Sequence, residues 1–343
     1  MPLSFAEFLA QLSRSPALAA TVLLTLAVLL VNGWTDAPNA IACAVVTGAL
    51  PFRRAVLLAA ACNFLGVVCV TAAQPAVART VYSIAQFSGG PKTALCALCA
   101  AMAAIVLWAA AAWLWGIPTS ESHALVAGVS GAAVALEGGF GCIRWDSWAK
   151  VLLGLVLSAA LGLFAGRAVW RALASVPLPP ALCRRLQIPG AALSAFLHGA
   201  QDGQKLLGIF LLGCALAAGR QDEQTFWVPL WAMALCALFM ALGTGLGGRR
   251  IIRRIGQEMV TLSPRDGLCC DLAGGACLLL ATLLGLPVST THTRTSALLG
   301  VGQAAGGPWD RRVARSIAAA WLLTFPCCFA MGFLFSRLLL NRL

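Results

Sequence analysis

The chain has 343 residues, of which 60% are hydrophobic and 10% charged, and its mean hydropathy is +0.87. A soluble globular protein is nearer half apolar and a quarter charged, so this composition excludes an ordinary soluble domain and indicates a membrane protein. The net charge of +12 would suggest a nucleic-acid partner in a soluble protein. In a membrane protein it is better explained by basic loops, and we expect no nucleic-acid binding.

Apolar segments follow one another along the chain, several of them near the ~20 residues that cross a hydrocarbon core of about 30 Å. No run of alternating strands suggests a barrel, so we predict an all-α polytopic membrane protein. Two of the segments, 119–140 and 287–306, are short and Gly-rich, and could be re-entrant arms instead of full crossings. The expected segments are 17–48, 55–76, 94–115, 119–140, 151–170, 191–219, 225–247, 268–285, 287–306 and 316–338.

The segments fall into two groups of five, which predicts a first repeat over 1–171 and a second over 191–343. Residues 172–190, rich in Pro and Arg, are expected to form a solvated cytoplasmic linker. If the N-terminus is outside and every segment crosses, fourteen Arg side chains lie on one side and eight Lys or Arg on the other. The side richer in Lys and Arg is expected to be cytoplasmic. Because five is odd, the second repeat enters from the opposite side, as in an inverted repeat.

Two polar motifs occur once in each half. NGWTDAPNA (32–40) has a partner in HGAQDGQK (198–205), and GIPTSESHA (116–124) has one in GLPVSTTHT (285–293). Asp36 and Asp202 are 166 residues apart, and His123 and His292 are 169 apart. Two unrelated motifs that repeat at nearly one spacing indicate internal duplication.

The first pair of motifs carries acids at membrane depth. An ionisable residue there costs several kcal/mol unless it is paired or lines a wet cavity, so Asp36 and Asp202 are candidate functional residues. A simpler interpretation is that Asp202 pairs with Lys205 on one helix face, but it leaves the upstream copy, which has no lysine, unexplained. Asp271 could join a cation path or cap the helix that begins after Pro264. The other polar residues of this candidate site are Asn32, Thr35, Asn39, His198 and Gln201.

The second pair of motifs is expected to start helices. Ser and Thr are favoured N-caps, and a helix start presents free N–H groups and the positive end of the dipole. Two such starts meeting across an inverted repeat would form a cradle for a tetrahedral oxyanion. The alternative is ordinary capping beside a loop, with each histidine a satisfied polar residue. The candidate donors are Ser120, Ser122, Ser289, Thr290 and Thr291.

On these motifs, which occur in order and in duplicate over most of the chain, the sequence resembles the inorganic phosphate transporter (PiT) family, and more closely its bacterial low-affinity branch. The resemblance implies a symporter of the bacterial inner membrane that imports phosphate, in some members as a metal–phosphate complex, with H⁺ or Na⁺. It also implies discontinuous helices and, often, a homodimer. It places the signature acids at Asp36 and Asp202, where Na⁺ could bind. Carried over to this chain, the phosphate ligands are Ser120, Ser122, Ser289, Thr290, Thr291, Asn39, Lys205 and Gln201.

This chain departs from the family pattern at several positions. Thr35 and Gln201 replace the Asn that often precedes each acid, which weakens the case for sodium and favours proton coupling. Glu121 replaces a hydroxyl residue, and Arg294 replaces an apolar one. One hypothesis is that Arg294 compensates the charge of Glu121; the other is that Glu121 is protonated and carries the coupling proton. With His123, His198 and His292, Arg294 is expected to surround the direct ligands.

Two other functions compete with phosphate transport. A permease of the same fold could carry sulfate, and an intramembrane hydrolase could use a Ser/His pair such as Ser289 with His292. The duplication argues against an enzyme, and no GxSxG-type elbow is present. We expect no metal or redox cofactor, because the CxxC pair Cys96 and Cys99 lies within an apolar helix without a second pair.

Overall fold

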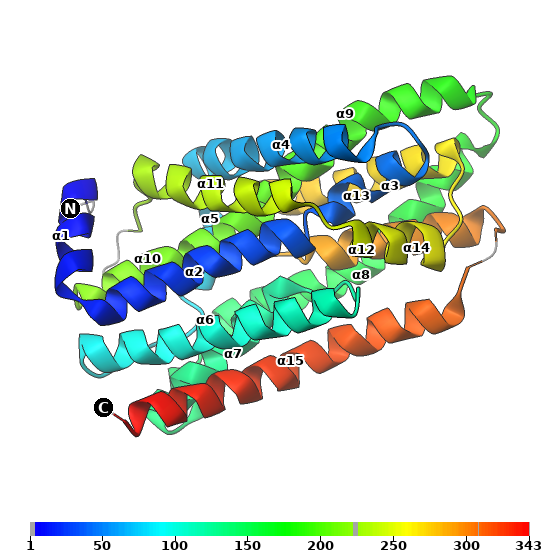
Figure 1. The fold of residues 1–343 in the computed structure, drawn as a ribbon. Coiled ribbons are helices and arrows are strands. Elements are labelled where there is room, and N and C mark those ends of the chain that lie inside the picture. The colour runs from blue at the N-terminus through cyan, green and yellow to red at the C-terminus, as the bar shows by residue number, and fades with distance from the viewer. Residues whose placement is uncertain (1–3, 222–225, 308, 343) are drawn as a thin grey trace.

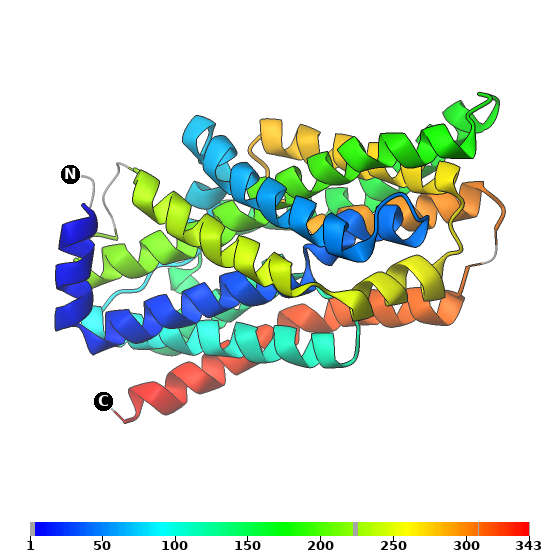
Figure 2. The same cartoon turned by 45° about the horizontal axis from the view of Figure 1, so that its top comes forward.

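The computed structural model describes residues 4–221, 226–307 and 309–342. The all-α prediction is confirmed: helices dominate, and the described residues contain two isolated β-bridges and no strand. The helices run side by side along one long axis, except α1, which lies across the end of the bundle (Figures 1 and 2). The elements are α1 (Phe5–Arg14), α2 (Pro16–Thr35), α3 (Pro38–Val46), α4 (Phe52–Ala73), α5 (Ala76–Tyr82), α6 (Pro91–Leu114), α7 (Glu121–Glu137), η1 (Phe140–Cys142), α8 (Trp145–Ala174), α9 (Pro180–His198), η2 (Gly199–Gly203), α10 (Gln204–Ala217), α11 (Leu230–Leu246), α12 (Arg249–Arg253), η3 (Arg254–Met259), α13 (Pro264–Leu283), α14 (Thr290–Ala304) and α15 (Arg311–Leu340).

The chain is a multi-pass membrane protein. Among the described residues, six helical segments are long and apolar enough to cross a membrane: Pro16–Val46, Phe52–Ala73, Pro91–Leu114, Trp145–Ala174, Pro264–Leu283 and Arg311–Leu340. Large apolar side chains on these helices are exposed on the outside of the bundle, for example Leu57 and Leu322. Exposure of such side chains is costly in water but not in lipid, so this surface suits a bilayer.

Two long helices are interrupted where they carry the duplicated acids. Between α2 and α3 the chain turns at Asp36 and Ala37, because Pro38 has no N–H to continue the helical hydrogen bonds. Between α9 and α10 the chain forms one wide π-helical turn, η2, which contains Asp202. Such turns leave backbone groups out of the regular ladder and are frequent at functional sites.

In two hairpins, α6–α7 and α13–α14, the first arm is long enough to cross a membrane and the second arm is shorter. Their second arms have 17 and 15 residues, which at 1.5 Å per residue gives about 25 and 22 Å, short of the hydrocarbon core. Each turn contains a glycine in the left-handed region, Gly116 (φ 66°) and Gly285 (φ 64°). The α6–α7 turn lies partway along the bundle, short of the end where α15 begins (Figure 1). The structure therefore favours re-entrant arms for the two short segments left open by the sequence.

Each hairpin arm packs against the last helix of the other half. The arm α7 packs on α15, and α14 packs on α8. Glycines bring the first pair into backbone contact: a Cβ on Gly131 would lie 2.1 Å from the Phe329 carbonyl oxygen, and one on Gly332 would lie 2.3 Å from the Gly128 carbonyl oxygen. Small residues at such crossings let membrane helices pack by van der Waals contact along their backbones.

The connection between the halves is shorter than predicted. The expected linker over 172–190 is mostly helical, because α8 continues to Ala174 and α9 begins at Pro180. Gln187, within the expected linker, is buried and donates to the Pro264 carbonyl oxygen at 2.9 Å. Packing of α9 on α13 therefore holds the second part of this segment against the bundle, although most of its side chains are exposed.

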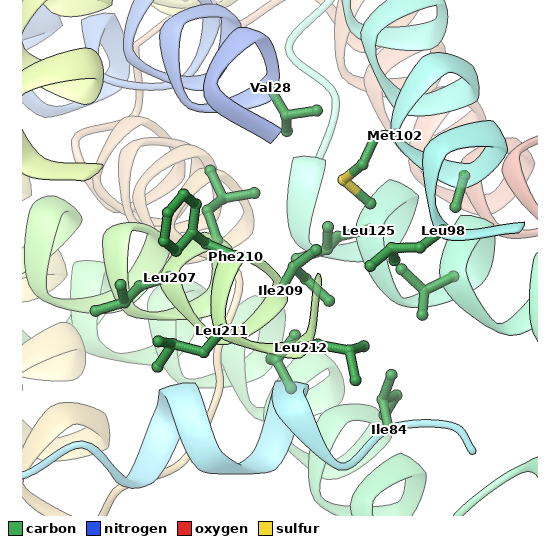
Figure 3. Close-up of a cluster of buried hydrophobic side chains, with 14 of the residues drawn as sticks. Val28, Ile84, Leu98, Met102, Leu125, Leu207, Ile209, Phe210, Leu211 and Leu212 are labelled. Atoms are coloured by element: carbon green, nitrogen blue, oxygen red, sulfur yellow. The ribbon is translucent and has the colours of Figure 1, made fainter. Parts of the chain in front are cut away.

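An apolar core supports one side of the interrupted helices. Figure 3 shows Phe210 and Ile209 of α10 beside Leu125 of α7 and Met102 of α6, all buried. Side chains in such a core are held at close packing density, so neighbouring elements have little freedom to shift. The core thus fixes α10 and α7 relative to each other next to the buried polar groups.

Candidate functional site

The tips of the two hairpins meet inside the protein. Ser120 is the N-cap of α7 and Ser289 is the N-cap of α14. Their side chains are 1% and 3% exposed, and the Ser289 hydroxyl donates to the Ser120 hydroxyl oxygen at 2.9 Å. From the sequence we expect two helix starts from opposite halves to converge, and in the structure these two helix starts are in direct contact.

The acid of the second half is held by a lysine and by the second hairpin. Lys205 Nζ lies 2.5 Å from Asp202 Oδ1, and the Thr290 hydroxyl donates to Asp202 Oδ2 at 2.7 Å. Lys205 also donates to Ser122 Oγ at 2.7 Å and to the Val288 carbonyl oxygen at 2.5 Å. The simple pairing of Asp202 with Lys205 is therefore present, but the ammonium also joins both hairpin tips.

Within the described part of the chain, no lysine or arginine pairs with the acid of the first half as Lys205 does with Asp202. Asp36 is 2% exposed and lies beside Thr291 and the backbone of Glu121. The Asn39 amide donates to the Thr291 hydroxyl at 3.2 Å, and the Thr35 hydroxyl donates to Glu121 Oε1. Three buried oxygens in this cluster lack a hydrogen-bond partner: Asn32 Oδ1, Asn39 Oδ1 and Glu121 Oε2.

Arg294 does not contact Glu121, so the hypothesis that it compensates the charge of that residue is wrong. Its guanidinium pairs with Asp271 Oδ1 at 2.6 Å, and both side chains are buried. The pair joins the two arms of the second hairpin. Asp271 also does not cap α13, because Ser263 and Asp266 form a capping box there. This location gives Asp271 a charged partner within the second hairpin.

The matching histidines lie together behind the serines. His123 and His292 are in edge-to-face contact with ring centroids 4.4 Å apart, and His292 stacks on Trp321 at 3.7 Å. Neither ring has a hydrogen-bond partner, so they are not the satisfied polar residues of the capping alternative. His198, in contrast, lies 2.9 Å from Asn63 Oδ1 and 3.4 Å from Asp202.

Several residues that hold the hairpin tips were not singled out from the sequence. The Ser289 backbone N–H donates to Ser158 Oγ at 2.9 Å, and Thr282 accepts from the Gln201 amide at 3.0 Å. The side-chain oxygen of Gln201 accepts from the Val288 N–H, so this side chain positions the second tip within the protein. Asn63, which contacts His198 at 2.9 Å, could have been detected as a polar residue with apolar neighbours on both sides; Ser158 and Thr282 gave no such signal.

The groups in the described part of the site are of the kinds that bind a small oxyanion and a cation. Hydroxyl groups and helix N-termini from both hairpins are suited to the anion, and carboxylate and amide oxygens at the helix breaks are suited to a hard cation or a proton. No cluster of three or more His, Cys, Asp or Glu side chains suited to a metal ion was found in the described residues.

Comparison with known proteins gives one consistent result. The model of the phosphate transporter family matches residues 32–179 and 172–332. A probable low-affinity inorganic phosphate transporter of Bacillus subtilis is 33% identical over 320 residues, covering 91% of this chain and 93% of that protein. A protein of the same description from Rhizobium meliloti is 35% identical over 304 residues, covering 86% and 88%. A solved structure described as "The sodium-dependent phosphate transporter" superposes with a TM-score of 0.83 at 22% identity, covering 96% of this chain and all of that one, which shows a shared fold.

Proposed function

The chain belongs to the phosphate transporter family, and on that premise we propose that it imports inorganic phosphate by alternating access, coupled to H⁺ or Na⁺. The observation that carries the proposal is the contact between Ser120 and Ser289 at 2.9 Å. It brings two helix N-termini from opposite halves to one buried point beside Asp36 and Asp202. An anion seat next to carboxylates is the arrangement that links anion movement to a cation.

Seven of the eight predicted phosphate ligands have a polar group near this point, and Gln201 is the exception. Ser120, Ser122, Ser289, Thr290 and Thr291 supply hydroxyls from both tips. Asn39 and Lys205 supply N–H donors, and hydrogen bonds to a charged oxyanion are stronger than those between neutral groups. Gln201 acts by holding the second tip, since both ends of its amide bind the protein.

We further propose that residues 1–171 and 191–343 are inverted repeats. The packing supports this, because α2 on α11 is matched by α4 on α9, and α7 on α15 is matched by α8 on α14. Rocking of one half against the other around the serine contact would then expose the anion seat to each side in turn. A homodimer remains a prediction of the family resemblance.

The coupling ion and the substrate species are the open parts of this function. The solved structure with a similar fold is described as a sodium-dependent transporter, and this description applies to that protein and not to this chain. In this chain Thr35 binds the Glu121 carboxyl, a group able to carry a proton, and this favours H⁺. A transported metal–phosphate complex would add a divalent cation at the same seat. The related alternative, sulfate, carries no proton at neutral pH, so a carboxylate that takes up a proton beside the anion favours phosphate.

The proposal is tested by uptake of labelled phosphate into proteoliposomes under an imposed pH gradient or sodium gradient. Asp36→Asn and Asp202→Asn should each abolish gradient-driven uptake, whereas Asp146→Asn, at an exposed position, should retain it. Arsenate should compete and sulfate should not. Uptake that is inhibited by sulfate but not by arsenate would establish the sulfate alternative, and failure of wild-type protein to take up phosphate under either gradient would reject the proposed function.

A further inference from the structure

The two interrupted helices are chemically unequal, although they occupy matching places. The offset of 166 residues that relates Asp36 to Asp202 also relates Asn39 to Lys205. The contacts follow the same relation: Asn39 Nδ2 reaches Thr291 Oγ1 at 3.2 Å, and Lys205 Nζ reaches Ser122 Oγ at 2.7 Å. One half thus has a neutral amide where the other has an ammonium.

The Lys205 ammonium is surrounded in the way a bound cation would be. Three oxygens lie at 2.5–2.7 Å from Nζ, one from the Asp202 carboxylate, one from the Ser122 hydroxyl and one from the Val288 carbonyl. These are the kinds of oxygen ligand that protein sites offer to hard cations. They come from the broken helix and from both hairpin tips, which is where a coupling cation would be placed.

The first half has the opposite property. Asp36 and Glu121 are both buried, and no Lys or Arg of the described residues forms an ion pair with either. Asn32 Oδ1, Asn39 Oδ1 and Glu121 Oε2 are buried without a partner. Unpaired oxygens in a low-dielectric interior are costly, and a cation that binds among them would relieve that cost.

We propose that Lys205 is a tethered cation that permanently occupies the cation position of the second half. The transporter therefore carries one monovalent cation, H⁺ or Na⁺, with each phosphate. This cation binds at the first-half oxygens of Asn32, Asp36, Asn39 and Glu121. This inference rests on the proposed function, since it specifies the cation side of the same transport cycle. It replaces the prediction of equivalent Na⁺ sites at Asp36 and Asp202. It makes Lys205 the residue that sets the number of cations moved with each phosphate.

The test is the zero-flux stoichiometry in proteoliposomes, with the membrane potential clamped at zero. For wild-type protein, a tenfold cation gradient should be balanced by a tenfold opposing gradient of the transported phosphate species. For Lys205→Asn, which gives the second half the first-half residue, balance should require a hundredfold gradient. Running the experiment with pH gradients and with sodium gradients identifies the ion.

The converse variant, Asn39→Lys, should place a tethered cation in the first half as well. It should bind phosphate in detergent with an affinity independent of sodium concentration, and independent of pH once the titration of phosphate itself is allowed for, whereas wild-type affinity depends on one of them. If wild-type protein requires a hundredfold phosphate gradient to balance a tenfold cation gradient, the inference is wrong even if neither variant folds. An unchanged ratio of ten in an active Lys205→Asn, or cation-dependent binding in Asn39→Lys, also overturns it. Wild-type protein that carries no phosphate would instead reject the underlying function.

Discussion

Removing one partner of the buried pair Arg294–Asp271 should destabilise the protein more than removing both. The side chains are 4% and 0% exposed, with the guanidinium nitrogen 2.6 Å from the carboxylate. Replacing either partner alone leaves an uncompensated charge in a dry interior, which costs about 3–5 kcal/mol. Arg294→Met and Asp271→Leu should therefore each lower the free energy of unfolding by this amount.

The double variant Arg294→Met/Asp271→Leu removes both charges at once. Replacement of a buried ion pair by apolar residues is often neutral or stabilising by about 1–4 kcal/mol. Arg294 also donates to Ser194 Oγ at 3.0 Å and to the Ala40 carbonyl oxygen at 3.4 Å, and loss of these bonds costs about 1 kcal/mol each. Because these contributions oppose each other, we expect the free energy of unfolding of the double variant to lie within about 2 kcal/mol of the wild-type value.

The assay is unfolding by sodium dodecyl sulfate in mixed micelles, followed through the fluorescence of the eleven tryptophans. The matched control is Arg253→Met, whose partner Glu258 lies at 3.2 Å but whose side chain is 74% exposed; it should cost less than about 1 kcal/mol. The reasoning is refuted if Arg294→Met is as mild as this control, or if the double variant is as unstable as the worse single variant.

Three further predictions concern the helix crossing, the anion seat and the coupling proton. Gly131→Ala places a Cβ 2.1 Å from the Phe329 carbonyl oxygen and should lower the free energy of unfolding in the same assay by about 1–3 kcal/mol; Gly275→Ala, whose Cβ would meet nothing nearer than 3.8 Å, should not, and equal effects would contradict the packing account. Ser120→Ala and Ser289→Ala each remove one hydroxyl donor worth about 0.5–1.5 kcal/mol and should raise the phosphate Kd, measured by equilibrium binding, by about 2–12-fold; Ser130→Ala, which loses a bond to Trp148 instead, should leave Kd unchanged, and a wild-type Kd in both tip variants would remove the serines from the seat. Glu121→Gln keeps the side-chain size but cannot take up a proton, so the pH dependence of phosphate uptake should flatten; an unchanged profile would show that Glu121 is not the proton carrier.

Local chemistry was sufficient to predict the long apolar helices, but not the π-helical turn that contains Asp202. Long apolar runs locate the crossings because a bilayer requires them, and Pro38 locates one break because it removes a backbone donor. The repetition of Pro–hydroxyl–His sequences predicted two helix starts, and the convergence of Ser120 with Ser289 matches that expectation. These features depend on residues close together in the sequence.

The partners of the charged side chains could not be predicted in the same way. Arg294 lies only a few residues beyond the second tip, yet its side chain turns to Asp271 on the neighbouring arm, because the rotation of α14 is set by packing on α8. The contacts of His123 with His292, and of Gln201 with the second tip, likewise depend on how separate helices are oriented. Sequence spacing places a residue along its own helix but does not fix the rotation of that helix against another.

The exchange of packing partners between halves has a consequence for biogenesis. The arm α7 ends at Glu137, but the helix that covers it, α15, begins at Arg311. During synthesis, more than half of the chain must therefore be translated after the first hairpin before α15 can cover the glycine-lined face of α7. Final docking of α7 can occur only after translation has nearly ended, so the membrane-insertion machinery or surrounding lipid must shield that arm in the meantime.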